Sequence, residues 1–140
     1  SIRAGYTISC KENMKILSKA RIAHELSSVS VAIAEYLIDN YKVVKKNVAK
    51  IKASRKLIKK KLKNLGLENR SQYGNYILIK FKNSKESTKV VQFLKEKFIY
   101  VKGPYQKPWD SFINISIGPF SIMRRFLIGL KEAKRKKVFF

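Results

Sequence analysis

The sequence predicts a small α+β domain in which helices cover a mostly antiparallel sheet of three or four strands. Two observations favour this class. Helical patterns of apolar residues alternate along the chain with short runs of β-branched and aromatic residues, and the last two of these runs are close enough in sequence to form a hairpin. The 140 residues, 45% of them hydrophobic, are sufficient to bury the core of one domain.

The N-terminal part of the chain predicts one short strand and two helices. We expect the strand at residues 6–9 and the first helix at residues 11–20, where apolar side chains recur at helical spacing. Ser27 and Ser28 can cap a second helix, which runs from Val29 to Ile38. Because Ala, Val, Ile and Leu dominate this segment, the second helix is expected to be mostly buried.

The clearest pattern is a long helix over residues 41–65. Apolar residues recur there every three or four positions, with a single arginine, Arg55, in the stripe. Gly66 follows as the residue that ends the helix. The same segment contains eleven Lys or Arg residues and no acidic residue. A solvated outer face is the favoured interpretation, because the aromatic and polar side chains that read nucleic acid are scarce there.

The C-terminal half predicts three strands and two further helices. Residues 76–81 indicate a strand buried on both faces or nearly so, and an amphipathic helix follows over residues 86–97. Strands are expected at residues 98–102 and 112–117, joined by a loop that contains two prolines. A last helix opens at Pro119 or Ser121 and extends to about Lys134.

Composition limits the function classes. The net charge of +23 is explained best by phosphate-bearing ligands together with a codon bias toward lysine, with nucleic-acid binding as the second possibility. No run of 18 apolar residues occurs, so we expect no membrane span. A single cysteine, Cys10, excludes an internal disulfide and favours a cytoplasmic setting. His24, the one histidine, has no Cys or carboxylate at ligand spacing, so no metal site is expected.

Four sets of residues occur in the order found in one known family. The first set, Ile2-Arg3-Ala4-Gly5-Tyr6, lies near the start of the chain. Arg55 then precedes the run 62–67, Gly74-Asn75-Tyr76 opens a strand, and residues 99–102 are followed by residues 113–118. Together they resemble the C-terminal small domain of fold type I pyridoxal-phosphate enzymes. The nearest group is the class I/II aminotransferases of the histidinol-phosphate aminotransferase type. The first set is similar to that family's Leu-Arg-x-Gly-Tyr segment, and the last is similar to its Val-Arg and Leu-Arg-Ile-Thr-Val-Gly pair.

The resemblance implies that residues 1–140 are the small domain of a larger enzyme. The large domain, which carries the Schiff-base lysine, would then be absent from this chain, with that lysine upstream of Ser1. We therefore expect the chain alone to be inactive. The resemblance also implies that Arg3 binds the phosphate of pyridoxal 5'-phosphate. A guanidinium suits this role because it is always charged and can donate two parallel hydrogen bonds to a phosphate.

At the substrate end, the resemblance implies contacts from Asn114, Lys102 and Asn75. Asn114 stands where the family usually has the arginine that binds the substrate carboxylate, and Lys102 stands where it often has a second arginine. One interpretation is a substrate without a carboxylate, such as a phosphorylated or nucleotide-linked keto compound. The other is a degenerate site.

The activity implied is transfer of an amino group between an amino acid and a keto or phosphorylated keto compound, by a homodimer of the full-length protein. Two alternatives stay open. One is a pyridoxal-phosphate-dependent decarboxylase of a phosphorylated amino acid, which belongs to the same fold family. The other is a basic nucleic-acid-binding module built on residues 41–65, which would bind polyanions in a strongly salt-dependent way.

Overall fold

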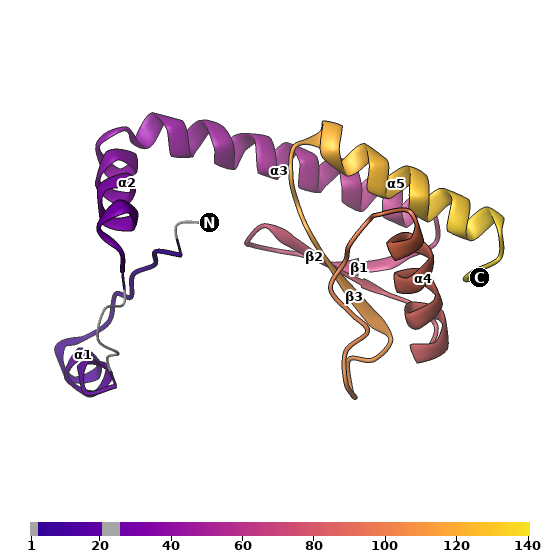
Figure 1. The fold of residues 1–140 in the computed structure, drawn as a ribbon, viewed down its shortest axis with the longest axis horizontal. Coiled ribbons are helices and arrows are strands. Elements are labelled where there is room, and N and C mark those ends of the chain that lie inside the picture. The colour runs from indigo at the N-terminus through magenta and orange to yellow at the C-terminus, as the bar shows by residue number, and fades with distance from the viewer. Residues whose placement is uncertain (1–2, 21–25) are drawn as a thin grey trace. The chain divides into compact units, whose positions relative to one another are not determined.

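The computed structural model describes residues 3–20 and 26–140 and divides into two compact units, Ser1–Asn47 and Val48–Phe140 (Figure 1). The elements in chain order are α1 (Lys11–Ser18), α2 (Ser28–Asp39), α3 (Tyr41–Asn64), β1 (Glu68–Arg70), β2 (Tyr76–Lys80), α4 (Ser84–Glu96), β3 (Phe112–Ser116) and α5 (Phe120–Arg135). The five predicted helices are thus confirmed, with ends within about two residues of the expected ones. Ile2 and His24 lie outside the described residues.

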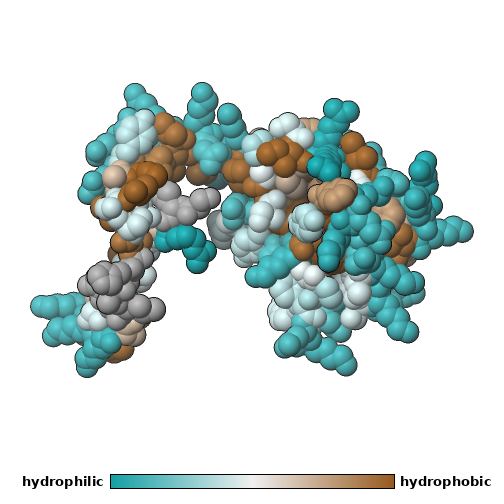
Figure 2. All heavy atoms as spheres, viewed as in Figure 1, coloured by the Kyte–Doolittle hydropathy of each residue, from teal (hydrophilic) through white to brown (hydrophobic). Residues whose placement is uncertain are grey.

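The first unit confirms a predicted helix cap and contradicts a predicted burial. The Ser27 hydroxyl accepts a hydrogen bond from the Ser30 amide at 3.1 Å and so caps α2. However, Val29 is 65% exposed and Ile38 is 71% exposed. Figure 2 shows hydrophobic side chains at the surface of this unit. An apolar composition favours burial, but burial of a helix needs another element that packs against it. The described residues provide no such packing surface for these side chains.

Two predicted strands are wrong. Residues 6–9 form no strand, and Tyr6 and Ile8 are exposed, because a strand needs a hydrogen-bonded neighbour and the described residues offer none there. Within residues 98–102 only Lys102 pairs with another strand. The Ile99 amide instead donates to the Leu94 carbonyl at 2.9 Å, which keeps the start of this segment at the end of α4. Strand β1 was not predicted, because it is short and polar.

The second unit is built on an antiparallel sheet in the order β1-β2-β3. Leu78 pairs with Asn114, and this register places Ile77, Ile79, Ile113 and Ile115 together on one face. All four are buried, in one core with apolar side chains of α3, α4 and α5. Helices therefore cover this face of the sheet, and the predicted α+β class is confirmed.

The prediction that the strand at residues 76–81 is buried on both faces, or nearly so, is wrong for one face of β2. The strand is not buried on both faces: Tyr76 and Lys80 are exposed and Leu78 is half-buried, while Ile77 and Ile79 between them are fully buried. The long apolar run had suggested burial on both sides. Within the second unit, helices cover one side only, so the alternate side chains are accessible among its residues.

The helices of the second unit end in the same hydrogen-bonded motif. At the end of α3, the Leu67 amide donates to the Leu62 carbonyl at 3.1 Å, and Gly66 between them has a φ of 79°. This confirms the predicted role of Gly66. Phe98 after α4 and Lys137 after α5 take the equivalent position, with φ values of 57° and 55°. Side chains larger than glycine are strained in this conformation.

Helix α5 ties the ends of α3 and α4 together. The Lys134 ammonium donates to the Leu65 carbonyl at 2.6 Å, and the Arg125 guanidinium donates to the Lys97 carbonyl at 3.0 Å. Lys97 also lies 2.9 Å from the carboxylate of Glu132, and this hydrogen bond lowers the pKa of Glu132 below its ordinary value of 4.5. Cations placed at the C-terminal ends of helices satisfy carbonyls that have no partner within the helix.

We expect Gly66→Ala to destabilise the chain by about 1 kcal/mol, because an L residue is strained at positive φ. A Cβ at this position would meet its nearest neighbours at 3.5 Å, an ordinary contact, so backbone strain is the main cost. Urea denaturation measures the free energy of unfolding. Gly118→Ala is the control, because that glycine has no positive φ and its Cβ would meet nothing within 4 Å. Equal stability of the two variants would contradict this role of Gly66.

Candidate functional site

The face of the sheet opposite the core carries polar side chains. Side chains alternate along a strand, so Asn114 and Ser116 of β3 point away from the face that holds Ile113 and Ile115. Asn114 is half-buried and Ser116 is exposed. Because the core-facing isoleucines fix the register, they also fix which β3 side chains reach this open face.

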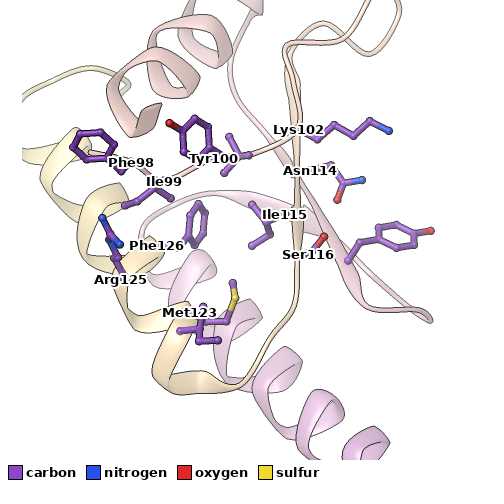
Figure 3. A pocket seen from close by; sticks show the side chains of 13 residues that line it. Phe98, Ile99, Tyr100, Lys102, Asn114, Ile115, Ser116, Met123, Arg125 and Phe126 are labelled. Atoms are coloured by element: carbon purple, nitrogen blue, oxygen red, sulfur yellow. The ribbon is translucent and has the colours of Figure 1, made fainter. Parts of the chain in front are cut away.

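Lys102 and Asn114 lie directly opposite each other on neighbouring segments. The Lys102 amide donates to the Asn114 carbonyl at 2.9 Å, and the Asn114 amide donates to the Lys102 carbonyl at 2.8 Å. Side chains of such a pair share one face of the sheet. Figure 3 shows the ammonium of Lys102 and the amide of Asn114 extending in the same direction. The structure thus brings together two of the residues selected from the sequence.

A cavity of about 720 Å³ lies between residues 98–102, β3 and the start of α5 (Figure 3). Its size is within the range of small-molecule sites. Ile115, Met123 and Phe126 provide apolar walls, and Lys102 and Asn114 belong to its polar edge. The remaining lining residues are Tyr76, Phe98, Ile99, Tyr100, Val101, Ser116, Ile122 and Arg125. The site can therefore bind a partly apolar molecule and place a cation beside it.

The cavity exists because the segment before Lys102 separates from β3. Tyr100 would be the next partner of Ser116 in an antiparallel pair, but these two residues form no bridge. Phe98, with its positive φ, begins this separated segment, and Phe98 and Tyr100 are both about three-quarters exposed (73% and 74%). Sequence reasoning missed both aromatic residues. The signal that could have identified them is an aromatic residue at alternate positions of a short segment.

Asn75 lies beside the cavity without lining it. It is exposed, and its carbonyl accepts a hydrogen bond from the Ile117 amide at 2.6 Å. The next residue, Tyr76, lines the cavity and pairs with Ser116 of β3. The backbone of Asn75 therefore continues the pairing between β2 and β3 toward the cavity.

Arg3 belongs to the first unit and is exposed. Among the described residues its guanidinium makes no hydrogen bond or ion pair. Five N–H donors without a protein acceptor are chemically suited to a phosphate dianion. Gly5, two residues later, has open space where a Cβ would lie, so this segment leaves room for a ligand. By these criteria Arg3 fits the phosphate group of pyridoxal 5'-phosphate.

Other ligand types find less support in the described residues. They contain no group of three His, Cys, Asp or Glu side chains that could hold a metal ion. None of the helices among them is long and apolar enough to cross a membrane. On α3, the lysines are exposed apart from the half-buried Lys59, as expected for a solvated face.

Comparison with known proteins identifies the family. The sequence model of "Aminotransferase class I and II" matches residues 1–124. The histidinol-phosphate aminotransferase of Clostridium kluyveri is 31% identical over 121 residues, which cover 84% of this chain and 33% of that protein. The histidinol-phosphate aminotransferase of Thermotoga neapolitana is 29% identical over 100 residues, or 71% of this chain and 30% of that protein. The chain thus spans about a third of the length of these relatives.

A solved structure agrees on the fold. Histidinol-phosphate aminotransferase from Sinorhizobium meliloti, in complex with pyridoxal 5'-phosphate, superposes with a TM-score of 0.76 at 23% identity, over 89% of this chain and 34% of that chain. The resemblance inferred from the sequence is confirmed, and neither the decarboxylase nor the nucleic-acid alternative gains support. The chain belongs to the class I and II aminotransferase family.

Proposed function

We propose that the full-length protein containing this chain is a pyridoxal-phosphate-dependent aminotransferase. It transfers an amino group between an amino acid and a keto or phosphorylated keto compound. The family match over residues 1–124 carries this proposal. The Schiff-base lysine belongs to a large domain outside these 140 residues, and the protein acts as a cytoplasmic homodimer.

The role of Arg3 is to bind the cofactor phosphate. Its exposed guanidinium, which makes no hydrogen bond or ion pair within the described residues, supports this assignment. When bound, pyridoxal 5'-phosphate supplies an electron sink for breaking bonds at the carbon that bears the amine. Arg3 does not take part in that chemistry; it holds the phosphate and so orients the ring.

Lys102 and Asn114 bind the substrate, and Asn75 lies at the edge of the same site. The Lys102 ammonium attracts an anionic group, and the Asn114 amide can donate a hydrogen bond without adding charge. The apolar walls of the cavity exclude water from the less polar part of the substrate. Histidinol phosphate, the compound in the names of these relatives, carries a phosphate group. Its phosphate can pair with the Lys102 ammonium, and we propose it as the first substrate to test.

The cofactor role of Arg3 predicts weaker binding of pyridoxal 5'-phosphate by Arg3→Ala. Loss of a charge-assisted hydrogen bond to phosphate should raise the Kd about 10- to 100-fold, and Arg3→Lys should give an intermediate value. Visible absorption of the full-length protein, titrated with the cofactor before and after borohydride reduction, measures this. A folded wild-type protein without a reducible absorption band would contradict the proposed function. An unchanged Kd in Arg3→Ala would contradict the role of Arg3 alone.

The substrate role of Lys102 predicts a different pattern. Lys102→Met should raise the KM for histidinol phosphate about 10-fold, because the phosphate loses a charged partner, while the Kd for the cofactor stays unchanged. Steady-state kinetics with the full-length protein provide both values. Lys107→Met is the matched control, since Lys107 is an exposed lysine of the next loop that does not line the cavity. If both variants have the wild-type KM, Lys102 does not bind this substrate.

A further inference from the structure

Two side chains of α3 hold the turn between β1 and β2, residues 71–75. The Arg55 guanidinium donates from Nη1 to the Gln72 carbonyl at 2.8 Å and from Nη2 to the Gly74 carbonyl. One helical turn further along, the Lys59 ammonium donates to the Ser71 carbonyl at 2.9 Å. Three carbonyls of one short turn are therefore bound by cations from a single helix.

The guanidinium of Arg55 is suited to this arrangement. Its two terminal nitrogens lie in one plane and reach two carbonyls that are separated by a single residue, the exposed Tyr73. Its Nε is buried and has no hydrogen-bond partner within the described chain. The Arg55 side chain thus starts from the core-facing stripe of α3, and its guanidinium is held by the turn. A lysine at this position would keep the charge but would lose the planar pair of donors.

The same turn fixes the start of β2 beside the cavity. The Ser71 hydroxyl donates to the Tyr76 carbonyl at 2.6 Å. Gly74 has a φ of 75°, and a Cβ there would lie 3.0 Å from the Tyr76 ring, so the turn passes close to this ring and leaves no room for a side chain. Tyr76 lines the cavity, and Asn75 lies between it and Gly74. The turn therefore acts together with the pairing of Tyr76 and Ser116 to hold Asn75 and the Tyr76 ring at the edge of the cavity.

We propose that Arg55 is a positioning residue for substrate binding. By holding the carbonyls of Gln72 and Gly74, it places Asn75 and the Tyr76 ring at the edge of the cavity that receives the substrate. Arg55 does not line the cavity. This inference rests on the proposed aminotransferase function and deepens it. It makes substrate affinity depend on a residue of α3 that contacts the turn and not the cavity.

The test compares Arg55→Lys with wild type in the full-length enzyme loaded with pyridoxal 5'-phosphate. With histidinol phosphate as amino donor and 2-oxoglutarate as acceptor, the KM for histidinol phosphate should rise about 10-fold, since small displacements of positioning groups weaken productive binding strongly. The Kd for the cofactor should stay within about 2-fold of wild type, because Arg55 contacts the turn, whereas the proposed phosphate ligand, Arg3, belongs to the first unit. The matched control is Arg124→Lys, because Arg124 is an exposed arginine of α5 that makes no hydrogen bond or ion pair with the described part of the chain.

A second variant perturbs the turn while leaving Arg55 unchanged. Gly74→Ala strains the backbone and crowds the Tyr76 ring, so it should reproduce the rise in KM with an unchanged cofactor Kd. Amide hydrogen exchange at residues 74–76, measured on the same proteins, should be faster in both variants and unchanged in Arg124→Lys.

The outcomes separate this inference from the proposed function. If the wild-type enzyme transaminates but Arg55→Lys keeps its KM, the positioning role is overturned while the proposed function stands. It is also overturned if Arg55→Lys raises KM and Gly74→Ala does not, because Arg55 would then act by another route than the turn. A wild-type protein that binds no pyridoxal 5'-phosphate and transfers no amino group overturns the proposed function, and with it any role in substrate binding.

Discussion

Burial of one face of the small antiparallel sheet is the constraint on which the second unit depends. Ile77, Ile79, Ile113 and Ile115 are each at most 4% exposed, and burial of such a side chain contributes about 1.5–3 kcal/mol. A slip of one residue in β3 would expose its isoleucines, so the register is strongly determined. The same register sets Asn114 on the open face, opposite Lys102. Packing of the core thus fixes the geometry of the candidate substrate site.

The cavity depends on two backbone hydrogen bonds that hold the two ends of residues 98–102. The Ile99 amide completes the end of α4, while the Lys102 amide pairs with Asn114 of β3. Because the Ile99 and Lys102 amides are held by different elements, the segment between them does not pair with β3 along its whole length. The space that it leaves is lined by apolar side chains of α5. The strained φ of Phe98 belongs to this arrangement. Cavity and helix end are therefore two consequences of one local conformation.

Much of the fold could be predicted from the sequence, because it is encoded locally. Helical spacing identified α3, Gly66 identified its end, and the serine before α2 identified its cap. The predictions that were wrong concern features that depend on residues outside the segment concerned. Whether α2 is buried depends on another element packing against it, which its own sequence does not encode. Residues 98–102 do not form a full strand because the Ile99 amide bonds to the end of α4. For the site, the roles of Arg3, Lys102 and Asn114 all came from the family resemblance, and residue type showed only that a guanidinium suits a phosphate. The role of Arg55 in holding the turn is visible only in three dimensions, since the sequence shows merely one cation in an apolar stripe.

The most direct test of the whole account is whether the full-length protein moves an amino nitrogen. The protein would be supplied with pyridoxal 5'-phosphate, histidinol phosphate labelled with nitrogen-15 at its amine, and 2-oxoglutarate, and the products would be followed by mass spectrometry. We expect the label to appear in glutamate, in amounts equal to the histidinol phosphate consumed. Absence of labelled glutamate, with correctly folded protein and also with other phosphorylated amines as donors, would contradict it.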